Sequence, residues 1–484
     1  MKLAYFSPLN PVQSGISDYS EDLLPSLAHY AQVDLFLTGS QPAPTNSKIS
    51  GGFVCQPISK FEAHAQSYDA WLFHMGNSAA HTQIYQLLQQ HKGNQRNFLV
   101  LHDFVLHHFL IGYYLNRGKV QDYVRLMTAS YGQAGERVAQ QVIHGKLPHA
   151  LFEFPLSNAA IEAAHAVIVH SQYAANLIRQ RHPTTRVGVV RMGVPLLPLV
   201  AQKTARARLG LPPDEFVLVS LGHLNPYKRL DSALWAFKSF VREFPNSRYI
   251  LVGSLSPNYD VKAMIRALGL ENKVQVVGFA SDTIYNDYLY ASDVCVNLRY
   301  PTAGETSASL LRIMGAARPV LVSRTGTFNE LPDDVCIKVD VDEAEEELLL
   351  EYLRLLKRDE ALRLQIGWQA RHYVATQARL EDAAYDYYEF ICQVMELPLE
   401  FSRPVAKEDL AQESYPFTTN KSQFALSGEK EISGQETLPT NNILTGQAGL
   451  IGEVAQAVLE LGIAEEAASL LDVAAALDFV GCGV

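Results

Sequence analysis

Cysteine is scarce in this sequence of 484 residues, and the few that occur are not arranged as metal ligands or as bridges. No two of them form a Cys-x-x-Cys pair, and no histidine lies beside them at the spacing of a zinc site. The missing patterns exclude a zinc-stabilised fold and a small disulfide scaffold. We therefore expect buried thiols in a reducing compartment. The cysteines are Cys55, Cys295, Cys336, Cys392 and Cys482.

Long apolar runs are also missing. No uninterrupted run approaches the ~20 apolar residues that a membrane-spanning helix needs. The sequence starts directly with an apolar strand at 3–6, without the basic region and longer apolar segment of a secretory signal. We expect a cytoplasmic protein, either free or peripheral at the inner face of the membrane.

The chain has no excess of positive charge. It carries 40 Lys and Arg against 51 Asp and Glu, a net charge of −11. From Phe401 onward 12 acidic residues stand against 4 basic ones, a balance of −8, which leaves −3 for the first 400 residues. Without a basic stripe to neutralise successive phosphates, nucleic acid is excluded as a partner. An anionic substrate must be bound by a few local cations, and the acidic C-terminal extension is a candidate surface for a protein partner.

What is present is an alternation of short apolar strands with longer helical patterns, which is typical of parallel sheets covered by helices on both faces. Two such series follow one another. The first has expected strands at 3–6, 33–37, 71–73, 98–101, 167–169 and 187–190. After a polar linker at about 202–208, the second has expected strands at 216–221, 249–252, 274–277, 294–298 and 320–322. Helices are expected at about 229–244, 261–269, 307–317 and 343–376.

These series predict an α/β protein with two doubly wound, Rossmann-like domains facing a cleft, at 1–195 and 196–380. Residues 401–446 are rich in Ser, Thr, Asn, Gln and Glu, which is typical of a flexible linker, and 447–484 have helical spacing. In such domains ligands bind at the carboxyl ends of the strands, so candidate residues are sought in the loops that follow them.

Two loops of the first domain carry candidates. Gly15 precedes an amphipathic helix, whose N-terminal N–H groups and dipole favour a phosphate, although a plain turn glycine is the alternative. His102 and Asp103 follow the fourth expected strand, which brings an imidazole to the crevice, although a lone histidine is often structural. Asp18 and Tyr19, just after Gly15, are further candidates beside Asp103.

In the second domain the first strand leads to His223 and then to Lys228 and Arg229. A departing diphosphate needs positive charge where its own charge grows, and Lys228 supplies it on a loop that opens a helix. The alternative is a solvated Lys-Arg pair, which is unusual at a helix start because cations there oppose the dipole.

A later loop runs from Gly304 through Glu305 into a helix. Glu305 offers a carboxylate to sugar hydroxyls, while the backbone N–H groups of Thr306, Ser307 and Ala308 are available to a phosphate. Alternatively, Glu305 only complements the helix dipole and Thr306 or Ser307 caps the helix.

Taken together, several spaced segments resemble retaining glycosyltransferase family 4 of the two-domain GT-B fold, over about residues 1–398. They are Gly222-His223-Leu224 with Tyr227-Lys228-Arg229, Leu251-Val252-Gly253, Gly278-Phe279, Ala291-Ser292-Asp293-Val294, Gly304-Glu305 and Gly326-Thr327-Phe328-Asn329-Glu330-Leu331-Pro332. The resemblance implies a nucleoside-diphosphate sugar as donor and no further cofactor. No metal ion is expected, because none of the expected strands ends in the Asp-x-Asp pattern that holds a divalent ion against a diphosphate. The resemblance also implies that Gly15 lies near the donor phosphates, that Lys228 holds the diphosphate, and that Asp18, Tyr19 and Asp103 lie on the side of the cleft that binds the sugar acceptor. It further implies that Glu305 binds sugar hydroxyls, that His102 contacts the transferred sugar, and that a helix at about 381–400 crosses back to the first domain.

Two positions depart from the family pattern. His223 stands where an arginine is common, and Ile313 stands eight residues after Glu305, where a second glutamate commonly binds the ribose hydroxyls. These departures put donor affinity and nucleotide preference in question more than the fold.

The implied reaction moves a hexose to an acceptor hydroxyl with retention at the anomeric carbon, and the leaving phosphate takes the acceptor proton. The acceptor class is a glycan, a lipid-linked sugar or a small molecule, in polysaccharide, cell-wall or glycolipid biosynthesis. Two other readings stay open: a catalytically degenerate GT-B binding or scaffold protein, which His223 and Ile313 motivate, and a sugar-nucleotide epimerase.

Overall fold

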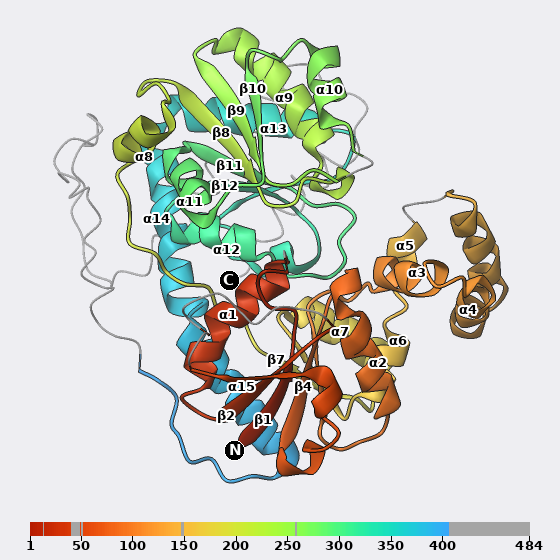
Figure 1. Cartoon of the computed structure of the whole chain (residues 1–484). Coiled ribbons are helices and arrows are strands. Elements are labelled where there is room, and N and C mark those ends of the chain that lie inside the picture. The colour runs from red at the N-terminus through yellow and green to blue at the C-terminus, as the bar shows by residue number, and fades with distance from the viewer. Residues whose placement is uncertain (13, 40–48, 50–51, 147–149, 257–258, 406–484) are drawn as a thin grey trace, which may run out of the picture.

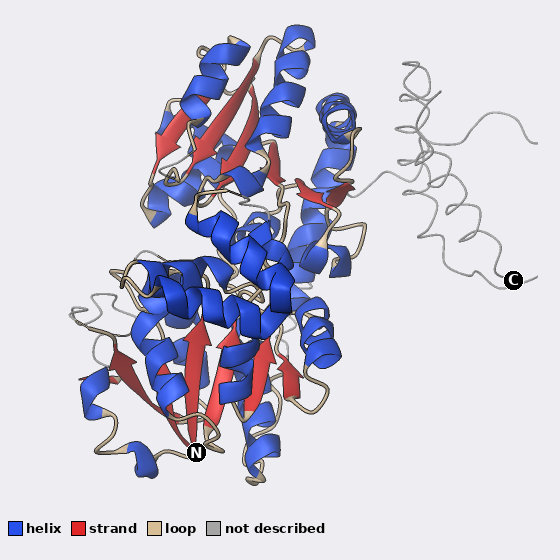
Figure 2. Cartoon of the chain, turned by 90° about the vertical axis from the view of Figure 1, so that its right-hand side faces the viewer, coloured by secondary structure: helices blue, strands red, loops and turns tan. Residues whose placement is uncertain are grey.

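The computed structural model describes residues 1–12, 14–39, 49, 52–146, 150–256 and 259–405. Within these ranges the chain forms two bodies, each built on a parallel sheet (Figure 1). Helices cover both faces of each sheet, and the strand arrowheads of both point toward the middle of the molecule (Figure 2). The predicted α/β class with two Rossmann-like domains is confirmed. The predicted helical extension at 447–484 and most of the predicted linker at 401–446 lie outside the described residues.

The first sheet has seven parallel strands in the order β3-β2-β1-β4-β5-β6-β7. Its central strands are largely apolar because both faces are covered, and every residue of β4 and β5 is buried. Only the short edge strand β3 was not expected. The strands are β1 (Lys2–Phe6), β2 (Gln32–Leu37), β3 (Val54–Pro57), β4 (Ala70–Met75), β5 (Asn97–Leu101), β6 (Ala166–Val169) and β7 (Arg186–Val189). The helices are α1 (Gly15–Leu27), α2 (Thr82–Gln90), α3 (His107–Leu115), α4 (Val120–Ile143), α5 (Ala150–Glu153), α6 (Asn158–Ala163) and α7 (Gln172–Arg181).

The second sheet has six parallel strands in the order β10-β9-β8-β11-β12-β13. The five expected strands are present, and β13 adds an edge. The strands are β8 (Phe216–Leu221), β9 (Ser247–Val252), β10 (Val274–Gly278), β11 (Val294–Asn297), β12 (Val320–Ser323) and β13 (Ile337–Val339). The helices are α8 (Gln202–Leu209), α9 (Leu230–Glu243), α10 (Val261–Leu268), α11 (Asp282–Ala291), α12 (Ala308–Gly315), α13 (Glu345–Arg358) and α14 (Glu360–Gln377).

One apolar core is shared by the two bodies. It contains residues of β1 and α1 from the first body and of β8 and α12 from the second, together with helix α15 (Leu380–Met395). Two further cores fill the outer faces of the first and second sheets. Because α15 follows the second sheet but packs against α1, it fixes the two bodies to one another.

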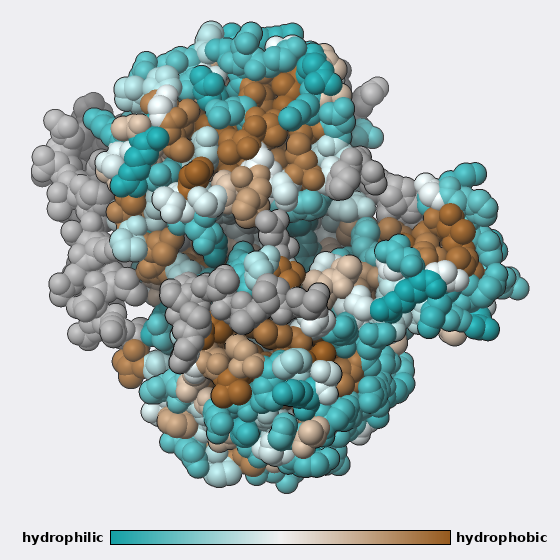
Figure 3. Space-filling model, in the orientation of Figure 1, coloured by the Kyte–Doolittle hydropathy of each residue, from teal (hydrophilic) through white to brown (hydrophobic). Residues whose placement is uncertain are grey.

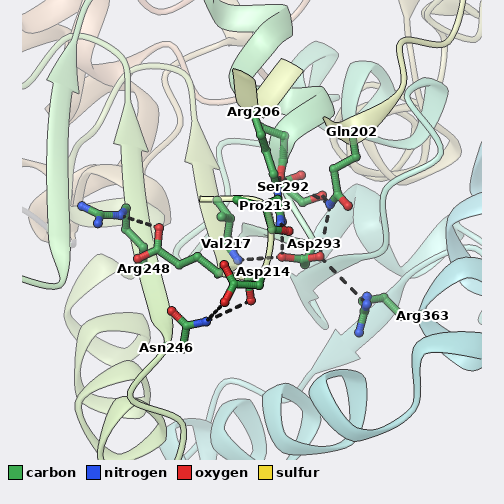
Figure 4. Close-up of polar contacts among 12 residues, drawn as sticks. Gln202, Arg206, Pro213, Asp214, Val217, Asn246, Arg248, Ser292, Asp293 and Arg363 are labelled. Carbon is green, nitrogen blue, oxygen red and sulfur yellow. Dashed lines mark hydrogen bonds and ion pairs between the residues drawn. The ribbon is translucent and has the colours of Figure 1, made fainter. Parts of the chain in front are cut away.

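The predicted polar linker at about 202–208 is instead helix α8, held by a buried carboxylate (Figure 4). Asp293, directly before β11, accepts hydrogen bonds from Arg206 at 2.6 Å, from Gln202 at 3.1 Å and from the backbone N–H of Val217 at 2.7 Å. Arg363 of α14 lies 3.9 Å from the same carboxylate. Gln202 and Arg206 of α8 therefore face the body, which the sequence alone does not indicate.

Two predicted boundaries also differ from the structure. The helix expected at 343–376 is divided into α13 and α14 because Asp359 ends the first and caps the second, accepting from the N–H of Leu362 at 2.8 Å. The first residues of the predicted linker contact the body: the Phe401 ring packs on Tyr388, and Arg403 pairs with Asp386.

Candidate active site

The loops that follow the strands of the two sheets meet between the bodies. The N–H of Val105, after β5, donates to the carbonyl of Ala303, after β11, at 2.9 Å. A Cβ at Gly304 would lie 2.7 Å from Cβ of Phe104, so only glycine permits this approach. In Figure 3 the surface is hollowed along the line where the two bodies meet. The loops that carry the predicted residues of both domains therefore meet along one interdomain cleft.

Lys228 lies at the end of a single 3-10 turn (Pro226–Lys228) between β8 and α9. Its side chain is buried, and its ammonium donates to the carbonyl of Leu221 at the end of β8. Gly222 leaves room for it, since a Cβ there would lie 3.0 Å from Nζ. Burial lowers the pKa of Lys228 to about 7; the charge of Arg299 adds to this effect, and that of Glu305 opposes it. An anion placed beside Nζ would restore the full charge.

Glu305 is held within its own loop. One carboxylate oxygen accepts from the N–H of Ala303 at 2.7 Å and from the hydroxyl of Thr302 at 3.2 Å. The other lies 3.0 Å from Nε of Arg299. The carboxylate is thus fixed in place near the cleft, with its charge balanced by an arginine.

The helix after this loop, α12, is capped by Ser307, in agreement with the alternative that Thr306 or Ser307 caps it. The Ser307 hydroxyl accepts from the N–H of Leu310 at 3.3 Å, so Ser307 is the N-cap residue. Thr306 and Ser307 line a hollow between the domains, together with His170 and Arg191 of the first domain. The N–H groups of Thr306, Ser307 and Ala308 therefore lie at a helix start that borders the first domain.

The other two basic residues of the Lys228 loop are placed differently. Arg229 has a left-handed backbone (φ 50°), and its guanidinium binds the buried carboxylate of Glu345 on α13 and the hydroxyl of Ser232. His223 lies at the surface of the cleft, with Nδ1 2.9 Å from the Ser254 hydroxyl. Partial desolvation and the charge of Lys228 lower the pKa of His223. Arg229 is thus committed to a structural ion pair, and His223 is neutral at pH 7.

Helix α1 brings the predicted residues of the first loop to the cleft with one exception. Gly15 begins the helix, and a Cβ there would meet nothing within 4 Å, so its backbone is open to a ligand. Asp18 lines an interdomain hollow with Arg312 of α12. Tyr19, by contrast, is buried, with its hydroxyl 3.3 Å from that of Tyr387 and its ring against His102. Tyr19 supports the site from behind instead of facing an acceptor.

His102 lies in the middle of a chain of histidines that crosses adjacent strand ends. His170 Nδ1 bonds to the carbonyl of Val190 at 2.9 Å, and its Nε2 lies 3.1 Å from His102 Nδ1. His102 Nε2 lies 3.0 Å from His74 Nδ1. Because a carbonyl can only accept, His170 must donate to it, so His102 donates to His170 and accepts from His74. Both nitrogens of the predicted sugar contact are therefore occupied by other side chains.

The histidine chain is uncharged. Burial lowers the pKa of His170 to about 4, and burial with the neighbouring histidines lowers the pKa of His102 and His74 well below the usual range. His81 donates to the carbonyl of His74 at 2.9 Å, and burial lowers its pKa to about 4. The first domain thus presents a neutral, hydrogen-bonded wall at this end of its sheet.

Asp103 lies beside this wall, at the cleft. Its carboxylate accepts from the N–H of Asn77 at 2.8 Å. Burial and the charge of Glu305 raise its pKa to about 7, while the Asn77 hydrogen bond and Arg299 oppose the rise. The carboxylates of Asp103 and Glu305, which come from different domains, are therefore close enough to repel one another.

Sequence reasoning missed Arg299, His74 and His170. All three lie at strand ends, His74 within the end of β4, His170 directly after β6 and Arg299 two residues after β11. Their position after an apolar strand is the signal that would have found them.

Ile313 is fully buried in the shared core, so the position where the family commonly has a second glutamate is closed to a ligand here.

An Asp-x-Asp triplet, Asp340-Val341-Asp342, follows the edge strand β13 and was overlooked in the sequence. Asp340 pairs with Arg324 at 2.8 Å, and Asp342 accepts from the N–H of Ala344 at 2.9 Å. Across the described ranges, no group of three or more His, Cys, Asp or Glu side chains is arranged to hold a metal ion. None of the helices in those ranges is long and apolar enough to cross a membrane.

Comparison with known proteins agrees with this architecture. Residues 201–373 match the family model "Glycosyl transferases group 1". A relative, the alpha-monoglucosyldiacylglycerol synthase of Acholeplasma laidlawii, is 21% identical over 187 residues, which cover 37% of this chain and 46% of the relative. The chain therefore matches less than half the length of that relative.

Two solved structures share the fold across both domains. Sucrose-phosphate synthase from Thermosynechococcus elongatus superposes with a TM-score of 0.59 at 18% identity, over 82% of this chain and 99% of the other. Anabaena HepE in complex with UDP-glucose superposes with a TM-score of 0.57 at 17% identity, over 81% of this chain and all of the other. Residues 201–373 thus match the glycosyl transferase group 1 model, and the chain has the two-domain fold of the GT-B glycosyltransferases.

Proposed function

We propose that this protein is a retaining, metal-independent glycosyltransferase that moves a hexose from a nucleoside-diphosphate sugar to an acceptor hydroxyl. The observation that carries the proposal is the buried ammonium of Lys228, in the same strand-end cluster as the Glu305 carboxylate and close to Arg299. A buried cation with a pKa of about 7 is suited to a ligand whose charge increases during the reaction.

The roles follow from the contacts. The diphosphate would lie against Lys228 and the N–H groups of Thr306, Ser307 and Ala308 at the start of α12, with Gly15 opposite. Glu305 would accept hydrogen bonds from sugar hydroxyls. His102 would act through its fixed ring as part of the neutral wall, and Asp103 and Asp18 would border the acceptor. Closing the domains would exclude water from the cleft.

The identity of the donor is supported by two relatives. The HepE structure was determined in complex with UDP-glucose, and the Acholeplasma protein is named as a monoglucosyldiacylglycerol synthase. These names favour a UDP-hexose over other donors and a glycan or lipid-linked acceptor. A role in polysaccharide, cell-wall or glycolipid assembly rests on the same likeness.

The proposal is tested with a panel of UDP-, GDP- and ADP-sugars. The correct donor raises the melting temperature, because a ligand at 100 times its Kd stabilises by about 2.7 kcal/mol. It also releases nucleoside diphosphate, by hydrolysis or by transfer, at the same rate with EDTA present. Binding without any release would favour the scaffold alternative, and appearance of an epimerised sugar nucleotide would identify an epimerase. Product with the opposite anomeric configuration would contradict retention.

A further inference from the structure

Arg299 lies beside Lys228 because their strands are neighbours. Arg299 follows β11, Lys228 follows β8, and these strands pair in parallel at the centre of the second sheet. The N–H of Tyr300 donates to the carbonyl of Tyr227 at 2.8 Å, which joins the two loops next to both cations. On its other side, the N–H of Arg299 donates to the Ser323 hydroxyl at 2.9 Å. The backbone of Arg299 is thus anchored on both sides.

The side chain of Arg299 is less fully engaged than its backbone. Its Nε lies 3.0 Å from Glu305, yet this buried N–H makes no aligned hydrogen bond within the part of the chain described here. The contact is a charge pair without the two parallel hydrogen bonds that an arginine forms with a carboxylate in its favoured geometry. A guanidinium fixed in this way retains donors for a second anion.

The charges in the cluster are also unbalanced for a diphosphate. Arg299 and Lys228 are close enough that the charge of Arg299 lowers the pKa of Lys228. The other two nearby bases do not help, because Arg229 is bound to Glu345 and His223 is neutral at pH 7. Even when it is fully charged, the single ammonium of Lys228 balances only part of a diphosphate that carries at least two negative charges.

We infer that Arg299 is the second phosphate-binding cation of the donor site, gripping the diphosphate together with Lys228. In the empty site its charge is held by Glu305. When a donor binds, the phosphate oxygens take up the guanidinium, and the Glu305 carboxylate is freed to accept from the sugar hydroxyls. This inference rests on the proposed function, since it assigns a residue to the same donor site.

The competing explanation is that Arg299 only positions Glu305. Inorganic pyrophosphate distinguishes the two explanations, because it has phosphates but no sugar and no base. If Arg299 binds phosphate, Arg299→Gln weakens pyrophosphate binding, whereas Glu305→Gln leaves it unchanged or strengthens it by removing a like charge. If Arg299 only positions Glu305, neither variant changes pyrophosphate binding.

The experiment titrates pyrophosphate and UDP into the full chain by calorimetry. Arg299→Gln is expected to weaken both about 10- to 100-fold, the loss typical of a hydrogen bond to a charged group. Arg299→Lys is expected to lose less, because it keeps the charge but not the planar fork. The control is Arg248→Gln, which removes an arginine paired with Glu215 at the opposite end of the strands and should bind as the wild type does.

Wild-type pyrophosphate affinity in folded Arg299→Gln would overturn the inference and leave the proposed function standing, provided that the donor panel still shows release. An equal loss in Glu305→Gln would likewise overturn it, since the effect would then come from the pair. If Arg299→Gln does not fold, Arg299→Lys decides, and wild-type pyrophosphate affinity in folded Arg299→Lys would overturn the inference. If the wild type binds neither pyrophosphate nor the nucleoside diphosphate of any donor in the panel, both proposals are overturned together.

Discussion

The protonation of Lys228 is expected to change when an anion binds beside it. With a pKa of about 7, its ammonium is protonated in about a tenth of molecules at pH 8. A bound diphosphate favours the charged form, so binding at pH 8 should take up close to one proton, and binding at pH 6 much less. Calorimetry with UDP in two buffers of different ionisation enthalpy measures this uptake. Lys228→Arg keeps the charge at all pH values and should abolish it, whereas uptake that persists in Lys228→Arg would assign the proton to another group, such as Asp103.

The burial of Ile313 determines what a glutamate at this position would do. Because it is fully buried in the shared core, Ile313→Glu should not create a ribose contact but should bury an unpaired carboxylate, at a cost of several kcal/mol of unfolding free energy. Ile284→Glu is the matched control, since Ile284 is 44% exposed on α11, and it should change stability by less than about 0.5 kcal/mol. Urea unfolding measures both. A folded Ile313→Glu with stronger UDP binding would show that the helix face is misassigned.

Residue type and strand-end position were enough to predict Lys228, Glu305, Gly15 and Asp103 as candidates. The direction of a side chain was not predictable in the same way. Arg229 turns toward Glu345, a partner 116 residues further along the chain, and both ring nitrogens of His102 bond to histidines from other strands. Such commitments depend on which loops the sheet order brings together, and no local pattern records them.

At the scale of elements, the Asp293 carboxylate joins α8, β8, β11 and α14 (Figure 4). Asp293→Ala leaves the buried guanidinium of Arg206 without its anion, and such a loss typically costs about 3–5 kcal/mol. Asp340→Ala removes a partly exposed pair with Arg324 and should cost less than about 1 kcal/mol. Chemical unfolding of the two variants tests this contrast, and equal stabilities would show that the buried pair contributes nothing specific.

The contacts of Asp293 also explain why α8 was not predicted from the sequence. Helix α8 is too polar and too short to be recognised from apolar spacing, and its stability comes from Asp293 and the adjacent carbonyl groups. Strands β3 and β13 are short edges with few apolar residues in alternation. The central strands, which are buried on both faces, were all predicted because burial demands continuous apolar residues.

The histidine chain links β4, β5, β6 and the end of β7 and makes the first domain sensitive to acid. Its members have folded pKa values lowered from about 6.5, so the unfolded chain binds more protons below pH 6.5, and stability is lost as the pH falls toward the folded value of about 4. The urea midpoint should therefore fall progressively between pH 6.5 and 4.5. His170→Gln should flatten this fall, whereas the exposed control His144→Gln should not. A midpoint independent of pH over this range would contradict the neutral assignment.

At the scale of the whole molecule, the cleft is made by contacts that cross between the bodies. Val105 bonds to Ala303, the His108 imidazole lies 3.2 Å from the Tyr227 hydroxyl, and Arg312 lies 3.4 Å from Asp22. Tyr227 directly precedes Lys228, so a residue next to the proposed leaving-group cation contacts the first domain. Helix α15 holds the bodies together on the side of α1, which leaves the strand-end loops to meet across the cleft.

The proposed function depends above all on Lys228, which stabilises the charge that grows on a departing nucleoside diphosphate. The most direct test is the single-turnover rate of nucleoside diphosphate release from the donor that the panel identifies, in wild type, in Lys228→Ala and in the exposed control Lys262→Ala, with folding verified by circular dichroism. We expect Lys228→Ala to release nucleoside diphosphate about 10²–10³ times more slowly than the wild type, as for the loss of one electrostatic donor, and Lys262→Ala to release it at the wild-type rate. A wild-type rate in folded Lys228→Ala would contradict this role of Lys228.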